Sequence, residues 1–157
     1  MKFSTKEDIE APIADTFALF TEFDHFERSA LRRGADVRRT DSMRTTGVGM
    51  AWASGFKLRG RTRNVNAEMV EFVPNENYTI ELQSNDIAAF AVVDLLALSK
   101  SRTRASISVE LKPKSLSGRL MVQTMRLAKT RLVKRFKMKV SGFVLNVERQ
   151  YKTGART

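Results

Sequence analysis

Three side chains that could do chemistry stand in stretches that are otherwise apolar or strand-like. Asp94 is the only charged residue in the run Phe90 to Leu98, and Trp52 and Tyr78 occur where apolar and polar residues alternate. Tryptophan and tyrosine each bring a polar handle into an apolar space, and a carboxyl or phenol group there could transfer a proton. Such residues suit a ligand pocket, although core packing is the more common explanation for Trp52 and Tyr78.

The direction of Asp94 depends on the loop that follows its strand. A two- or four-residue loop pairs Asp94 with Ile107 and turns it inward, where only Lys139 or Arg135 are available as cations. A three- or five-residue loop, or a bulge, turns it to solvent. A buried carboxylate is costly unless it is paired, so the solvent-facing arrangement is favoured. The inward alternative remains open at this point.

Several other kinds of chemistry are excluded by composition. The chain has no cysteine, which removes disulfides, Cys-ligated zinc and thiol nucleophiles. Its one histidine, His25, rules out the usual His-rich metal sites and reads by default as a surface residue between Asp24 and Glu27. No phosphate loop or nucleophile elbow occurs. We therefore expect neither a metal nor a cofactor.

The N-terminal third alternates between strand and helix patterns. Residues 3–9 predict a first strand, and Pro12 suits the first turn of a helix that continues to Phe20. A second short helix follows through Phe26 and Leu31, and Gly34 is placed to end it.

Between Val37 and Leu111 the period changes from 3.6 to 2, which is typical of an antiparallel meander with one wet face. We expect six strands here, in addition to the first. Trp52, Phe56 and Tyr78 fall on the face that we assign inward, and Ile80 shares that face. These side chains are therefore candidates for the lining of an internal space.

A long amphipathic helix is predicted from about Leu116 to Arg149. Apolar residues spaced by threes and fours, including Leu132, Phe136 and Val140, form one face. At 1.5 Å per residue this helix would be about 50 Å long, so we expect it to cross the sheet as a diagonal. A curved sheet around one long helix leaves a space between them, and this apolar face should line its largest part.

The opposite face of that helix is cationic. No acidic residue occurs between Glu110 and Glu148, and Arg126, Lys134 and Lys137 point outward together. With a formal net charge of +11, the chain favours anionic partners. An anionic membrane surface fits this charge. Nucleic acid fits less well, because the face lacks interleaved exposed aromatic rings, and a solvated basic surface without a partner explains the same pattern.

The length of the chain predicts one domain, and its composition predicts no membrane span. The 157 residues suffice for a single core, which we assign to residues 1–151, and residues 152–157 are expected to form a disordered tail. Residues 1–10 lack the apolar run of a signal peptide, and the longest apolar run is about half the length that a membrane span needs. We expect a soluble, cytoplasmic protein.

The order of these elements resembles the helix-grip fold of the START and Bet v 1-like (SRPBCC) superfamily, which includes polyketide cyclase/dehydrase-like proteins. Two motifs carry the resemblance locally. Residues 9–12 (Ile-Glu-Ala-Pro), followed by Asp15-Thr16-Phe17, are similar to its first strand end and first helix. Residues 103–105 (Thr-Arg-Ala) are similar to the start of its last strand. The resemblance implies an α+β fold: a curved seven-stranded antiparallel sheet, two short helices and a long C-terminal helix around an apolar cavity.

Members of this superfamily bind lipids, sterols, hormones or polyketides, or catalyse cyclisation, without shared catalytic residues. We therefore interpret the chain as a carrier or sensor of a hydrophobic or amphipathic, lipid- or polyketide-like molecule in preference to an enzyme. A cyclase or dehydratase that uses Asp94 and Tyr78 is the alternative, and a binder of anionic membrane or nucleic acid is a third. The oligomeric state is left open. The candidate ligand-binding residues are Trp52, Phe56, Tyr78, Ile80, Asp94, Leu132, Phe136 and Val140.

Overall fold

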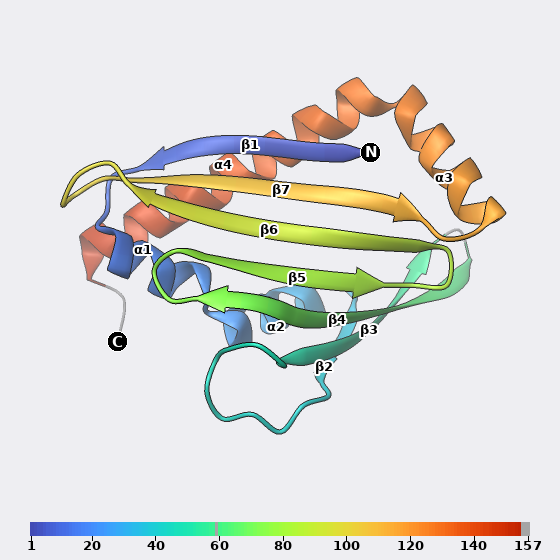
Figure 1. Ribbon diagram of the computed structural model, residues 1–157, viewed down its shortest axis with the longest axis horizontal. Helices are drawn as coiled ribbons and strands as arrows, with labels where there is room; N and C mark the ends of the chain where they lie inside the picture. Colours follow the sequence, from blue (N-terminus) through green and yellow to red (C-terminus); the bar gives the residue numbers. More distant parts are fainter. Residues whose placement is uncertain (59, 155–157) are drawn as a thin grey trace.

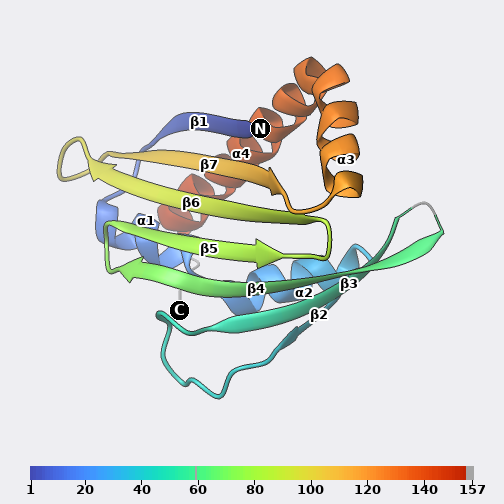
Figure 2. The same ribbon diagram turned by 45° about the vertical axis from the view of Figure 1, so that its right-hand side comes forward.

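A computed structural model describes residues 1–58 and 60–154, and it shows a curved antiparallel sheet with helices against its concave face (Figures 1 and 2). The predicted α+β helix-grip arrangement is confirmed. The elements in chain order are β1 (Lys2–Ile9), α1 (Ile13–Phe20), α2 (Phe23–Arg32), β2 (Asp36–Arg39), β3 (Ala51–Leu58), β4 (Arg61–Val73), β5 (Asn77–Gln83), β6 (Ile87–Ala97), β7 (Thr103–Pro113), α3 (Leu116–Leu127) and α4 (Lys129–Thr153).

The sheet is a meander closed by its first strand. Its seven strands lie in the order β1-β7-β6-β5-β4-β3-β2, so β1 pairs with the last strand and every other neighbour is consecutive in sequence. All pairs are antiparallel, as the period of 2 predicts. The register shifts between Met69 and Glu71, which marks a bulge in β4. A bulge increases the local twist and helps this sheet to curve around the helices.

The core lies between the concave face of the sheet and helices α1, α2 and α4. Phe20 and Ile9, from α1 and β1, are fully buried there, together with Met69 of β4 and Val147 of α4. Aromatic rings join the layers: Phe23 of α2 has its ring centroid 5.5 Å from the ring centroids of both Trp52 and Tyr78. The inward faces predicted from periodicity are therefore the faces that form the core.

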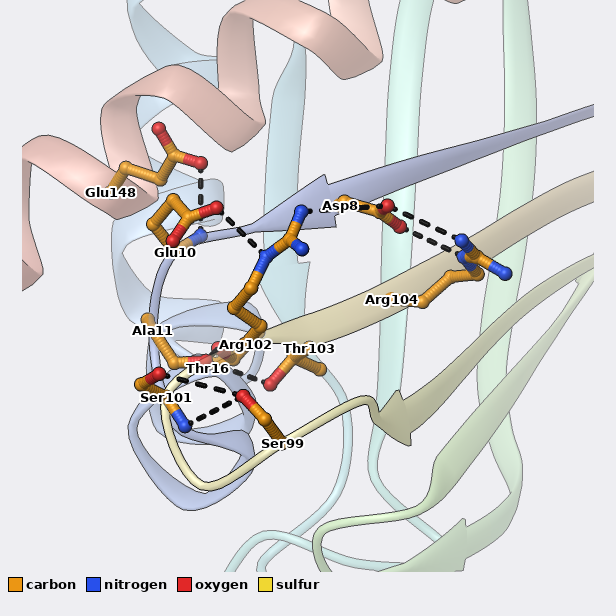
Figure 3. A network of polar contacts seen from close by, with 10 residues as sticks. All are labelled: Asp8, Glu10, Ala11, Thr16, Ser99, Ser101, Arg102, Thr103, Arg104 and Glu148. Carbon is orange, nitrogen blue, oxygen red and sulfur yellow. Dashed lines mark hydrogen bonds and ion pairs between the residues drawn. The ribbon is translucent and has the colours of Figure 1, made fainter.

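The two motifs that carried the superfamily resemblance meet in space (Figure 3). The carbonyl oxygen of Ala11 accepts a hydrogen bond from the hydroxyl of Thr103 at 2.8 Å and a longer one from Thr16 at 3.5 Å. Both threonines are fully buried. Nearer the surface, Arg102 and Arg104 form ion pairs with acidic groups at the end of β1. The motifs therefore hold the chain between β1 and α1 against the start of β7.

Thr103→Val is expected to lower the free energy of unfolding by about 1–3 kcal/mol, because the substitution keeps the shape but removes the donor to a buried carbonyl. Chemical denaturation measures this. Thr124→Val is the matched control, since the Thr124 hydroxyl donates to the carbonyl of Leu120 at an exposed site. Equal losses in the two variants would mean that the Ala11 carbonyl does not depend on Thr103.

The prediction of a single helix from Leu116 to Arg149 is wrong in one respect. The structure divides this segment at Ala128 into α3 and α4. Figures 1 and 2 show the two helices meeting at a corner. No proline or glycine marks the break, and alanine favours helix, so tertiary packing must decide it. A straight helix would carry residues 116–127 past the end of the sheet. The bend instead buries Gly118 and Val122, while α4 contacts β1.

The C-terminal end also differs from expectation. Lys152 and Thr153 belong to α4 and not to a disordered tail. Gly154 then ends the helix with a φ of 66°, a left-handed conformation that glycine adopts without strain. Residues 155–157, the rest of the expected tail, lie outside the described residues. Among the described helices, none is long and apolar enough to cross a membrane.

Candidate ligand pocket

A cavity of about 600 Å³ lies at the end of the sheet where β3, β4, the turn between β5 and β6, and α3 come together. Its apolar lining comes mainly from inward-facing strand residues, with Met121 added by α3. Its remaining lining is polar and includes Arg63, Lys114 and Asp86. The apolar lining residues are Phe56, Val65, Leu82, Ile87, Ala89 and Met121.

Hydrogen bonds around Asp86 fix α3 beside this cavity. The Ser115 hydroxyl donates to Asp86 Oδ1 at 2.9 Å and accepts from the backbone N–H of Gly118 at 3.0 Å, which makes Ser115 the N-cap of α3. The backbone N–H of Lys114 donates to the carbonyl of Asp86 at 2.8 Å. A side chain at Gly118 would overlap this same carbonyl. The approach of α3 to the β5–β6 turn therefore requires glycine.

Two cations lie at the pocket, and their hydrogen bonding differs. The Lys114 ammonium donates to Gln83 Oε1 and to the carbonyl of Ser84, both at 2.9 Å. Arg63 Nη1 is 3.7 Å from Asp86 Oδ2, and its buried Nε has no hydrogen-bond partner among the described residues. A guanidinium carries five N–H donors. Lys114 has one of its three donors left, whereas Arg63 makes only one long ion pair, so Arg63 offers a ligand the larger number of donors.

Trp52 and Tyr78 are buried in the core and do not line this pocket. The Trp52 indole donates to Glu27 Oε1 of α2 at 2.7 Å, and the Tyr78 hydroxyl donates to the carbonyl of Phe20 at 2.8 Å. Burial also raises the pKa of the Tyr78 hydroxyl above its ordinary value. The polar groups of both side chains are hydrogen-bonded within the fold, which agrees with the core-packing explanation.

Asp94 does not line this pocket, because its side chain is exposed on the convex face while Val93 and Leu95 are buried. The reason is the hairpin between β6 and β7. Ala97 pairs with Thr103, which leaves the five-residue loop 98–102, and Asp94 pairs with Ser106. Of the two arrangements weighed from the sequence, the solvent-facing one is therefore present.

The remaining candidates occupy the centre of the molecule. Val140 is buried and Ile80 and Phe136 pack partly buried against the core, where the Phe136 ring lies 6.0 Å from that of Phe3. The expected packing of Phe136 on the concave face is confirmed. Neither these residues nor the half-buried Leu132 line the pocket at the sheet end. Of the eight predicted residues, Phe56 alone belongs to that lining.

Sequence reasoning missed Arg63 as a pocket residue. The alternation in β4 could have placed Arg63 on the inward face, because Arg63 is two residues before Val65 and shares the face of Val65. In the structure Arg63 pairs directly with Phe56 of β3. A cation at an inward strand position is the kind of exception that marks a site.

Comparison by sequence gave no relatives: no protein-family model matches the chain, and no curated protein matches it. Solved structures do match. A norcoclaurine synthase mutant from Thalictrum flavum, in complex with a transition-state analogue, has a TM-score of 0.67 and 11% identity, covering 97% of this chain and 96% of the other. The Zhui aromatase/cyclase from Streptomyces sp. R1128 has a TM-score of 0.64 and 7% identity, covering 96% and 95%. A START superfamily protein from Mycobacterium smegmatis has a TM-score of 0.54 and 9% identity, covering 87% and 97%. At identities this low, the matches show a shared fold and nothing more.

Proposed function

We propose that this chain, which has the helix-grip fold of the START and Bet v 1-like superfamily, binds a small amphipathic molecule in the pocket beside α3. The observation that carries the proposal is the combination of an apolar lining with one incompletely bonded guanidinium, that of Arg63. Ligand pockets commonly have this composition, with many apolar side chains and a few placed polar groups. The similar folds of a cyclase and a START protein support the general kind of ligand.

The size of the pocket suits a small molecule. Its volume of about 600 Å³ lies within the roughly 300–1,000 Å³ of typical ligand pockets. Phe56, Leu82 and Met121 would contact the apolar body of the ligand. Methionine adapts to irregular shapes, which suits Met121 to contact with an apolar ligand.

The polar end of the ligand would bind at Arg63. A guanidinium presents a planar fork of donors that matches a carboxylate or phosphate. Asp86, at 3.7 Å, neutralises this charge only in part because the Asp86 carboxylate also accepts from Ser115. We therefore propose an acidic head group, which would replace this long ion pair with direct hydrogen bonds.

The enzyme alternative loses the groups on which it rested. Asp94 is on the convex face, and the Tyr78 hydroxyl is bonded to a backbone carbonyl. Among the residues that line the pocket, Asp86 is the one carboxylate, and it is engaged by Ser115 and Arg63. Binding is therefore the function that the described side chains support best, although two of the similar folds belong to enzymes by name.

Nile red, a neutral dye that fluoresces in apolar surroundings, tests the pocket. We expect it to bind the native protein, and Phe56→Glu and Met121→Glu to weaken its binding about tenfold or more, because each places a charge against the apolar body. Leu96→Glu is the control, since Leu96 is 60% exposed and does not line the pocket. Circular dichroism confirms that each variant is folded.

Absence of dye binding to the folded native protein would contradict the proposal, as would equal affinities in all three variants. Native mass spectrometry of the purified protein adds an independent readout. A co-purifying molecule with an apolar body and an acidic group would identify the ligand class directly.

A further inference from the structure

Helix α3 carries apolar side chains on two sides. One side packs toward the molecule, with Val122 buried and Met121 and Met125 half-buried. On the other side Leu116, Leu120 and Leu127 are 74%, 57% and 91% exposed. An amphipathic helix at a protein surface normally turns polar residues outward. The second apolar side of α3 is therefore not explained by the packing of this domain.

The three exposed leucines lie on one face of α3. Leu120 is four residues from Leu116, and Leu127 is seven residues further on, which are the spacings of residues on the same side of a helix. We call Leu116, Leu120 and Leu127 the leucine stripe. Single exposed leucines are ordinary, but an aligned group of them indicates a surface that contacts something apolar.

Cations lie beside the leucine stripe. Arg119 and Arg126 project from α3, Lys129 and Arg131 begin α4, and all four side chains are exposed. Within residues 1–58 and 60–154, the ion pairs of the structure involve none of them. Because no acidic residue occurs between Glu110 and Glu148, nothing in these two helices before Glu148 neutralises the charge.

We propose that the leucine stripe and the cations beside it form a docking surface for an anionic lipid membrane. Helices that lie in a membrane interface bury an apolar face at the boundary of the acyl chains while Lys and Arg contact the anionic head groups. The break at Ala128 favours this arrangement. It brings α3 out of line with α4, and the stripe with it, to a corner of the molecule (Figure 2).

Other occupants fit these observations less well. A second copy of the chain would bring the same unneutralised cations together, and each copy carries a net charge of +11. Nucleic acid would use the cations but not the leucines, because bases stack on aromatic or guanidinium planes. An anionic bilayer is complementary to both parts of the surface. The proposal goes beyond ligand binding and does not depend on it, although Met121 places the pocket on the other side of the same helix.

The test is co-sedimentation with vesicles made of equal amounts of phosphatidylserine and phosphatidylcholine, compared with pure phosphatidylcholine. Two matched double variants separate the leucine stripe from exposed leucine in general. L120Q with L127Q alters the stripe, and L31Q with L96Q alters leucines of 50% and 60% exposure on α2 and β6. R119Q with R126Q removes two cations without touching the leucines. Thermal unfolding checks the fold of each variant.

We expect the native protein to bind the anionic vesicles in low salt and to be released as salt rises, because exposed charges are screened beyond about 8 Å at physiological ionic strength. L120Q/L127Q should bind about tenfold more weakly or worse, and R119Q/R126Q should lose up to about fivefold per cation. L31Q/L96Q should match the native protein. The proposal would be overturned if both leucine variants bound the vesicles equally. It would also be overturned if the protein bound an oligonucleotide with an affinity that L120Q/L127Q left unchanged, or if it formed a dimer that L120Q/L127Q dissociated.

Discussion

A Gly118→Ala variant is expected to displace the start of α3 from the β5–β6 turn and to lower the free energy of unfolding by about 2 kcal/mol or more. A Cβ at this position would overlap the backbone carbonyl oxygen of Asp86 and lie 3.0 Å from its carbonyl carbon. Neither backbone can yield as a flexible side chain would. Overpacking of this kind costs about 1–3 kcal/mol even where side chains can adjust, and the intrinsic helix preference of alanine offsets at most about 1 kcal/mol.

The displacement should reach the pocket, because Ser115 caps the first turn of α3 and Met121 lies in the second turn. Moving α3 lengthens the hydrogen bond from Ser115 to Asp86 and withdraws Met121 from the lining. Nile red affinity and amide hydrogen exchange in α3 report this change, and chemical denaturation reports the stability.

Gly142→Ala is the matched control. It is also a glycine inside a helix, but a Cβ there meets nothing within 4 Å, so alanine should raise stability by up to about 1 kcal/mol. If Gly118→Ala stabilised the protein in the same way and left dye binding unchanged, the close approach of α3 to the turn would not be what positions the pocket.

The periodicity of apolar residues predicted the strands and helices that bury one face and expose the other. The alternation of Tyr78, Ile80 and Leu82 with polar neighbours correctly gave the inward face of β5, since a half-buried strand must separate its residues in this way. The spacing of Phe136 and Val140 likewise gave the inward face of α4. Local pattern was sufficient wherever one neighbouring layer decided burial.

The pocket was not predictable in this way, because its position depends on contacts between distant elements. Ala128 gives no local signal for a break, and only the packing of α3 on β7 and the β5–β6 turn requires one. The direction of Asp94 depended on a loop length that the sequence leaves open. Trp52 and Tyr78 were assigned to the correct face, but their partners, Glu27 and the carbonyl of Phe20, come from helices whose placement no strand pattern encodes.

Arg63→Gln is expected to weaken the binding of dodecanoate by about tenfold to a hundredfold while changing the binding of dodecanol little. The two probes share an apolar chain and differ in the head group, so the comparison isolates the polar contact. A hydrogen bond to a charged group contributes about 1.5–3 kcal/mol, and glutamine keeps part of the length of arginine but neither its charge nor its fork of donors. Displacement of Nile red from the native and variant proteins measures both affinities.

Arg61→Gln is the control, because it removes the same charge from an exposed residue of the same strand. Arg61 does not line the pocket. If the contact is direct, only Arg63→Gln changes the preference for dodecanoate over dodecanol, and added salt reduces that preference only slightly. If instead both variants weaken dodecanoate binding by the same small factor, and salt abolishes the difference, the fatty acid senses only the net positive field of the protein. That outcome would leave an apolar pocket without the head-group site that its one incompletely bonded guanidinium indicates.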